Sequence, residues 1–187
     1  MAVIKAFECI RPDEKVADRV AALPYDVYNR EEALKEVERE PLSFLAIDRA
    51  ETQFDSSVDT YADCVYDKAR ELLDSRIADG TFITDTDKAY YVYELTMNGR
   101  TQTGIAACAS IDDYNNNIIK KHENTRADKE QDRINHVDRC SAQTGPIFLA
   151  YRADEVIRNE VVKAKETKPL YSFTSPDGIR HQVYKIS

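Results

Sequence analysis

The sequence predicts an α+β fold: a mixed, largely antiparallel sheet with two β-hairpins, flanked by four or five helices. Apolar residues recur at helical spacing in the first half of the chain, whereas aromatic and branched residues dominate after Lys88. Two hairpin turn signals, Asn-Gly at 98–99 and Ser-Pro-Asp-Gly at 175–178, follow in the second half. We expect one domain over residues 1–187, with a weak point near 85–88.

The first half of the chain predicts mainly helices. We expect an opening strand over residues 2–10, helices over 13–23, 30–39 and 58–79, and a buried strand over 43–47. Asn29 and Glu32 stand three residues apart, the spacing of a capping box at the start of a helix. Ser56 with Asp59 predicts the cap of the longest helix, and Gly80 suits the left-handed residue after its end.

The second half predicts strands joined by hairpins, with two further helices. We expect strands over 89–96, 101–111, 118–119 and 147–151, a loop over 112–117, helices over 126–140 and 153–165, and a closing hairpin over 170–186. Thr125 with Asp128 has capping-box spacing for the 126–140 helix. The 147–151 segment, Ile-Phe-Leu-Ala-Tyr, has the composition of a buried strand.

Composition excludes several classes of protein. The 187 residues are 42% hydrophobic and 32% charged, which is typical of a folded chain with a real core. The net charge of −8 opposes nucleic-acid binding unless a local basic patch is present. No apolar run has the length of a membrane span, and the N-terminus does not resemble a signal peptide. We therefore expect a cytoplasmic protein with no membrane partner.

No metal site is predicted. The four cysteines form no Cys-x-x-Cys pair, so zinc and iron–sulfur sites are disfavoured, and we expect free thiols. His122 and His136 are far apart in sequence, and no second histidine completes a zinc-protease motif. Cys140 near His136 resembles a nucleophile pair but has no third partner.

The most informative segment is the polar block over residues 120–136, followed by Gln-Thr-Gly-Pro at 143–146. A cationic strip on the predicted helix begins where the backbone N–H groups already favour an anion. We predict a site that holds a phosphate or carboxylate, with His122 or Glu123 as acid or base. The predicted anion-binding residues are Lys120, Lys121, Arg126, Lys129, Arg133, His136, Gln143 and Thr144.

The alternative for this block is a solvated surface helix of ion pairs, and runs of charge more often have that meaning. Two like-charge pairs four residues apart, Lys129/Arg133 and Asp128/Asp132, each cost on the order of 0.2–0.5 kcal/mol on a helix. Oppositely charged neighbours offset much of that cost. The residues alone leave both interpretations open.

Six segments, taken in order, resemble the bacterial and archaeal domain-of-unknown-function family 1015. They are Leu-Pro-Tyr-Asp-Val at 23–27, Pro-Leu-Ser-Phe-Leu at 41–45, Leu-Thr-Met-Asn-Gly-Arg at 95–100, Lys-Lys-His-Glu-Asn-Thr at 120–125, the charged residues at 128–133, and Gln-Thr-Gly-Pro-Ile-Phe-Leu at 143–149. The family has no established activity, and its members are longer than this chain. The resemblance therefore implies the N-terminal portion of a longer protein, with a downstream domain as its partner.

Longer members carry an Asp-Gly-His-His-Arg sequence similar to a phosphate-binding motif of free-serine kinases with a ParB/sulfiredoxin-type fold. The motif is absent here; residues 177–181, Asp-Gly-Ile-Arg-His, share only some of its letters. The resemblance implies a small-molecule kinase in which Glu123 deprotonates a hydroxyl and ATP or ADP with Mg²⁺ is held with downstream residues. On this interpretation the present chain alone is inactive.

Two other functions remain open from the sequence. One is a non-catalytic scaffold or interaction domain whose polar block contacts another domain. The other is a DNA-associated module, which rests only on the ParB-like link and is opposed by the acidic balance. Whether the chain belongs to an enzyme is therefore not decided by its residues.

Overall fold

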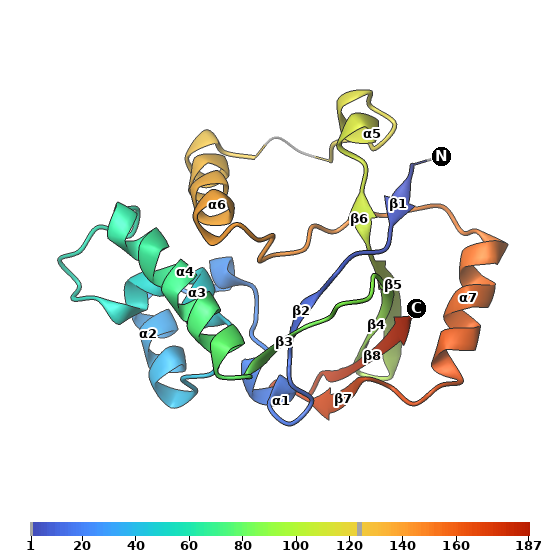
Figure 1. The fold of residues 1–187 in the computed structure, drawn as a ribbon, viewed down its shortest axis with the longest axis horizontal. Helices are drawn as coiled ribbons and strands as arrows, with labels where there is room; N and C mark the ends of the chain where they lie inside the picture. The colour runs from blue at the N-terminus through green and yellow to red at the C-terminus, as the bar shows by residue number, and fades with distance from the viewer. Residues whose placement is uncertain (1, 123–124) are drawn as a thin grey trace. The chain divides into compact units, whose positions relative to one another are not determined.

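The computed structural model describes residues 2–122 and 125–187, and these divide into two compact units that the chain visits alternately (Figure 1). Unit 1 holds residues up to 14, 84–122 and 147–187, and unit 2 holds residues 15–83 and 125–146. The chain passes from unit 2 to unit 1 between Ile83 and Thr84, next to the weak point expected near 85–88. The α+β class is confirmed, since helices and small antiparallel sheets share the chain.

The strands of the structure are short except in one sheet. Their bounds are β1 (Ile4–Lys5), β2 (Ile10–Pro12), β3 (Phe82–Thr84), β4 (Tyr90–Met97), β5 (Arg100–Ala106), β6 (Cys108–Ala109), β7 (Tyr171–Thr174) and β8 (Arg180–Ile186). The helices are α1 (Ala17–Val20), α2 (Arg30–Arg39), α3 (Leu45–Asp48), α4 (Asp63–Ala78), α5 (Ile111–Asn115), α6 (Ala127–Cys140) and α7 (Glu155–Lys165), with 3-10 turns η1 (Tyr25–Val27) and η2 (Ala50–Gln53).

Unit 1 is built on a four-stranded antiparallel sheet in the order β5-β4-β8-β7. Both predicted hairpins are present in it. Asn98 and Gly99 have positive φ values of 51° and 77°, the conformation that a two-residue hairpin turn requires. Helix α7 packs on one face of this sheet, where Ala164 meets Val92 and Tyr184.

A buried polar cluster lies within unit 1 and centres on Asp85. The guanidinium of Arg11 donates two hydrogen bonds to the Asp85 carboxylate, at 2.9 and 3.0 Å. The Tyr91 hydroxyl donates a third at 2.6 Å, and Lys185 lies 3.2 Å away. Arg11 also donates to the Tyr171 hydroxyl at 3.1 Å, so these residues together link the N-terminal segment to three strands of the sheet. We call these five residues the Asp85 cluster.

Unit 2 is helical, and its main core brings distant segments together around α4. The predicted capping box is confirmed: Asn29 accepts from the Glu32 backbone N–H at 3.0 Å and Glu32 reaches back at 2.9 Å. Gly80 has the expected positive φ, 81°, after α4. The core residues are Val20, Ile47, Ala50, Val65, Ala69, Leu73, Phe82 and Cys140.

Some expected helices are shorter than the sequence pattern indicated. The expected 13–23 helix is reduced to α1, and Leu23 at its far end is exposed. Helix α4 begins at Asp63, and Ser56 and Asp59 lie in the turns before it rather than at its cap. The Asp59 carboxylate instead accepts from the Tyr61 backbone N–H. Local turns satisfied by such carboxylates compete with helix formation.

Several predicted strands are wrong. Residues 43–47 are buried, as expected, but they lead into helix α3. The expected loop at 112–117 contains α5, whose N-cap Ser110 accepts from Asp113. Residues 118–119 form no strand. Residues 147–151 form no strand either: Ile147 and Phe148 are 72% and 80% exposed.

Candidate functional site

Helix α6 brings the predicted polar residues together with the core of unit 2. It packs against α4, and the residues that it buries are Asp132, His136 and Cys140, one turn apart. Its N-cap is Arg126 with no side-chain hydrogen bond, so the predicted capping box of Thr125 and Asp128 is wrong. The Asp128 carboxylate instead pairs with Arg126 at 2.8 Å, outside the pocket described below.

His136 lies on the buried side of α6. Its Nε2 donates to the Ile47 carbonyl at 3.0 Å, which leaves Nδ1 as an acceptor, 3.3 Å from the Thr144 hydroxyl. Burial lowers the pKa of His136, and the carbonyl of Ile47 opposes that effect only in part. Cys140 lies 3.9 Å from Nδ1, and burial raises the pKa of its thiol to about 11. The thiol is therefore protonated at neutral pH, as expected of a core cysteine.

Arg133 is the central cation of the site. Its Nε and Nη2 donate to one oxygen of Asp132, at 3.2 and 2.9 Å. Tyr66 donates to the other oxygen at 3.0 Å. The guanidinium lies 4.2 Å from the centre of the Tyr25 ring, and its Nη1 lies 3.9 Å from the Asp48 carboxylate. Two carboxylates and one ring therefore surround a single guanidinium.

Asp48, at the C-terminal end of α3, is a carboxylate near Arg133 whose pKa is strongly raised. Its side chain is 17% exposed, and burial raises its pKa from 3.8 to about 6. The charge of Arg133 and a hydrogen bond from Thr144 lower the pKa, but less than burial raises it. Asp48 therefore changes its charge close to neutral pH, next to the cation of the site.

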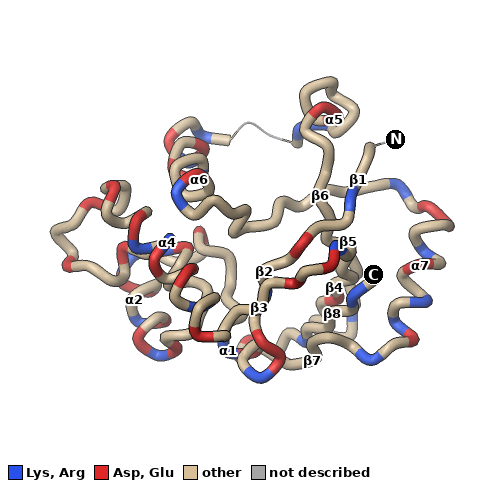
Figure 2. The backbone as a smooth tube through the Cα atoms, in the orientation of Figure 1, with Lys and Arg blue, Asp and Glu red and all other residues tan. Residues whose placement is uncertain are grey.

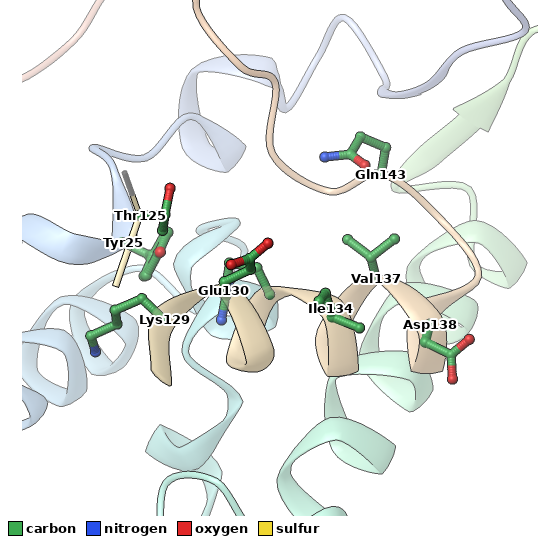
Figure 3. Close-up of a pocket in the computed structure, with 9 residues that line it drawn as sticks. Tyr25, Thr125, Lys129, Glu130, Ile134, Val137, Asp138 and Gln143 are labelled. Atoms are coloured by element: carbon green, nitrogen blue, oxygen red, sulfur yellow. The ribbon is translucent and has the colours of Figure 1, made fainter. Parts of the chain in front are cut away.

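A pocket of about 580 Å³ runs along the exposed side of α6 (Figure 3). Figure 3 shows Lys129, Glu130, Ile134, Val137 and Asp138 following one another along the helix. The remaining lining residues are Tyr25, Thr125, Arg133 and Gln143. The apolar side chains of Ile134 and Val137 thus lie between charged groups, so the pocket suits a small polar ligand with some apolar surface.

Lys129 and Arg133, on successive turns of α6, are the two basic residues among those that line this pocket. Lys129 donates to the neutral hydroxyl of Tyr61 at 3.0 Å, and this hydrogen bond raises the pKa of the ammonium group. Lys129 is therefore charged at neutral pH. Glu130 and Asp138 also line the pocket, so its charge is mixed.

The other predicted residues lie in different surroundings. Lys120, Lys121 and His122 are exposed residues of unit 1, and Lys121 lies 4.7 Å from the centre of the Tyr114 ring. Glu123, the predicted catalytic base, lies outside the described residues. Gln143 lines the pocket, whereas Thr144 contacts His136 beneath it.

Charge on the surface of the helices is distributed as the surface-helix alternative expects. Figure 2 shows acidic and basic residues mixed along α2, α4 and α6. Arg139 of α6 pairs with Asp67 of α4, and Arg70 of α4 pairs with Asp74 at 2.6 Å. Exposed pairs of this kind contribute little to stability. The two cations that line the pocket differ from these exposed ion pairs. Lys129 donates to a hydroxyl, and Arg133 is half-buried where it pairs with Asp132.

No metal centre is formed by the residues that the structure describes, since no group of three histidine, cysteine or carboxylate side chains converges there. All four cysteines are free, as expected.

Asp48 and Tyr25 were not predicted as site residues. Asp48 directly follows the apolar run at 44–47, and a carboxylate at the end of a buried segment was a signal that could have been used. Tyr25 lies within one of the family segments, but nothing local relates it to Arg133. Both contacts depend on the packing of α3 and η1 against α6.

The fold and the pocket define an α+β protein whose helical unit carries a mixed-charge pocket. The chain belongs to the family described as protein of unknown function, DUF1015, whose model matches residues 4–187. No curated protein and no solved structure matches the chain. Across residues 2–122 and 125–187, none of the helices combines the length and apolar character needed to cross a membrane.

Proposed function

We propose that the α6 pocket binds a small ligand through a phosphate or carboxylate group, and that the chain supplies this site to a phosphotransferase-like enzyme. The observation that carries the proposal is that Lys129 and Arg133 line the same pocket. Thr125 and Gln143 add a hydroxyl and an amide there, both able to donate to an anion. Charge-assisted hydrogen bonds of this kind are the usual means of holding phosphate.

Lys129 is the cation best suited to test the binding site. Its partner, the Tyr61 hydroxyl, is neutral, so replacing the lysine leaves no carboxylate without its cation. We expect Lys129→Gln to weaken phosphate binding about five- to tenfold, as the loss of one charge-assisted hydrogen bond implies. Titration calorimetry with inorganic phosphate measures this directly on the purified chain.

Lys35→Gln provides the matched control for that experiment. Lys35 lies on the surface of α2 and pairs with Glu31, and its side chain is 69% exposed. This variant makes the same change in net charge but should bind phosphate like the parent chain. Equal affinities for the parent and Lys129→Gln, or no phosphate binding by the parent at millimolar concentration, would contradict the proposal.

The catalytic part of the proposal rests on the family resemblance and is tested separately. In a longer family member that carries this segment together with Asp-Gly-His-His-Arg, Glu123 acts as the base that deprotonates a hydroxyl. Replacing it with glutamine should lower phosphoryl transfer about 100-fold or more, the range typical of losing a general base. Thermal unfolding should be unchanged. Full activity in Glu123→Gln would remove this residue from the mechanism.

A further inference from the structure

Arg133 takes part both in the pocket and in a buried carboxylate pair. Its Nε and Nη2 are engaged by Asp132, and Nη1 is the arm of the guanidinium nearest to Asp48, at 3.9 Å. At that distance Arg133 and Asp48 form an ion pair but no direct hydrogen bond. The availability of Nη1 to a ligand in the pocket therefore depends on the charge of Asp48.

We propose that Asp48 is a positioning residue that sets the anion affinity of the α6 pocket through Arg133. With Asp48 ionised, two carboxylates share one guanidinium, and an arriving anion meets an excess of negative charge. With Asp48 protonated, Arg133 keeps its fork on Asp132 and presents Nη1 to the pocket. Anion binding and proton uptake by Asp48 are then coupled. This inference rests on the proposed anion-binding function.

Ionisation of Asp48 occurs in the range where such coupling operates. Burial holds its pKa near 6, so its charge changes between about pH 5 and 7. A bound anion that raises this pKa by about one unit would, by linkage, bind about tenfold more tightly to the protonated form. The coupling is reciprocal, because it is a property of the two binding equilibria.

The other groups around Asp48 respond differently. His136 is buried, and burial lowers its pKa, which disfavours its charged form. Thr144 is a hydrogen-bond partner of both Asp48 and His136, and its single proton cannot serve both. Protonated Asp48 can donate to Thr144, which leaves the threonine proton for His136. The charged or titratable groups of the packed elements are Asp132, Arg133, His136 and Cys140 from α6, Tyr66 and Arg70 from α4, Tyr25 from η1, and the neighbouring Arg49.

The test measures sulfate binding by titration calorimetry at pH 5.0 and 7.5. Sulfate is the probe because, unlike phosphate, it stays a dianion over this range. We expect the parent chain to bind sulfate about sevenfold more tightly at pH 5.0 than at pH 7.5, with a midpoint between about pH 6 and 7. Asp48→Asn, which resembles the protonated carboxyl group, should bind tightly at both pH values. Circular dichroism checks that this variant is folded.

A general gain of positive charge at low pH would also favour sulfate, and Glu31→Gln controls for it. Glu31 is an exposed carboxylate of α2, so this variant changes net charge as Asp48→Asn does and should keep the pH dependence. The same pH dependence in Asp48→Asn, or none in the parent, would overturn the role of Asp48. Sulfate binding that is lost in Lys129→Gln but independent of pH would overturn this inference alone. No sulfate binding at either pH would overturn both the inference and the proposed function.

Discussion

Replacing Asp85 with alanine is expected to lower the free energy of unfolding by about 3–5 kcal/mol, the usual cost of leaving buried cations without their carboxylate. The Asp85 side chain is 8% exposed, and Arg11 and Lys185 are only 15% and 25% exposed. Without Asp85, Lys185 and the Tyr91 hydroxyl lose this acceptor, and Arg11 retains its hydrogen bond to the Tyr171 hydroxyl. Urea unfolding followed by circular dichroism measures the effect, since the chain has no tryptophan.

The Asp85 cluster also predicts that the folded chain loses stability in acid. Burial would raise the pKa of Asp85, but hydrogen bonds from Arg11, Tyr91 and Lys185 outweigh it and lower the pKa to about 2. A lowered pKa stabilises the folded chain above pH 4, and this contribution is lost as pH falls from about 4 to about 2. Asp87→Ala, in the same segment but exposed, is the control. If both variants unfold at the same urea concentration as the parent, the Asp85 cluster does not stabilise unit 1.

Replacing Asp48 with asparagine is expected to raise the free energy of unfolding at pH 7.5, on the order of 2–3 kcal/mol, because its pKa is raised from 3.8 to about 6. The folded chain must bury this carboxylate, and the attraction of Arg133 at 3.9 Å offsets only part of that cost. Asparagine has nearly the same shape without the charge. The expected stabilisation is therefore opposite in sign to the effect at Asp85.

The pH dependence distinguishes this cause from simple repacking. The raised pKa of Asp48 means that the parent chain is most stable, in this respect, below pH 4 and loses that advantage as pH rises through 6. The difference in free energy of unfolding between Asp48→Asn and the parent should reach its largest value above pH 6 and vanish below about pH 4. Urea unfolding at several pH values measures it. A variant less stable than the parent at pH 7.5 would show that the Arg133 pair dominates.

Elements fixed by local chemistry were predictable from the sequence. The capping box of α2, the Asn98-Gly99 turn and the closing hairpin follow from residues close together in the chain, and all three are present. Segments whose state depends on distant neighbours were not predictable. Residues 43–47 have the apolar composition of a buried strand, yet burial against α4 allows a helix equally well, and periodicity cannot separate the two.

The candidate site shows the same division. Lys129, Arg133 and Gln143 were selected from the sequence because helical spacing relates the first two and the third follows closely. Asp48 and Tyr25 were missed, since each reaches Arg133 only through the packing of segments more than 80 residues away in sequence. Tyr25 lines the pocket, and Asp48 faces Arg133.

The sequence by itself determined the α+β class, the positions of α2, α6 and the hairpins, and the family of this chain. These features come from short-range periodicity, capping and turn chemistry. Only the tertiary structure decided that His136 is a buried structural residue, that Lys129 and Arg133 share a pocket, and that Asp48 carries a raised pKa. Burial and charge proximity are properties of the packed chain, so no local pattern specifies them.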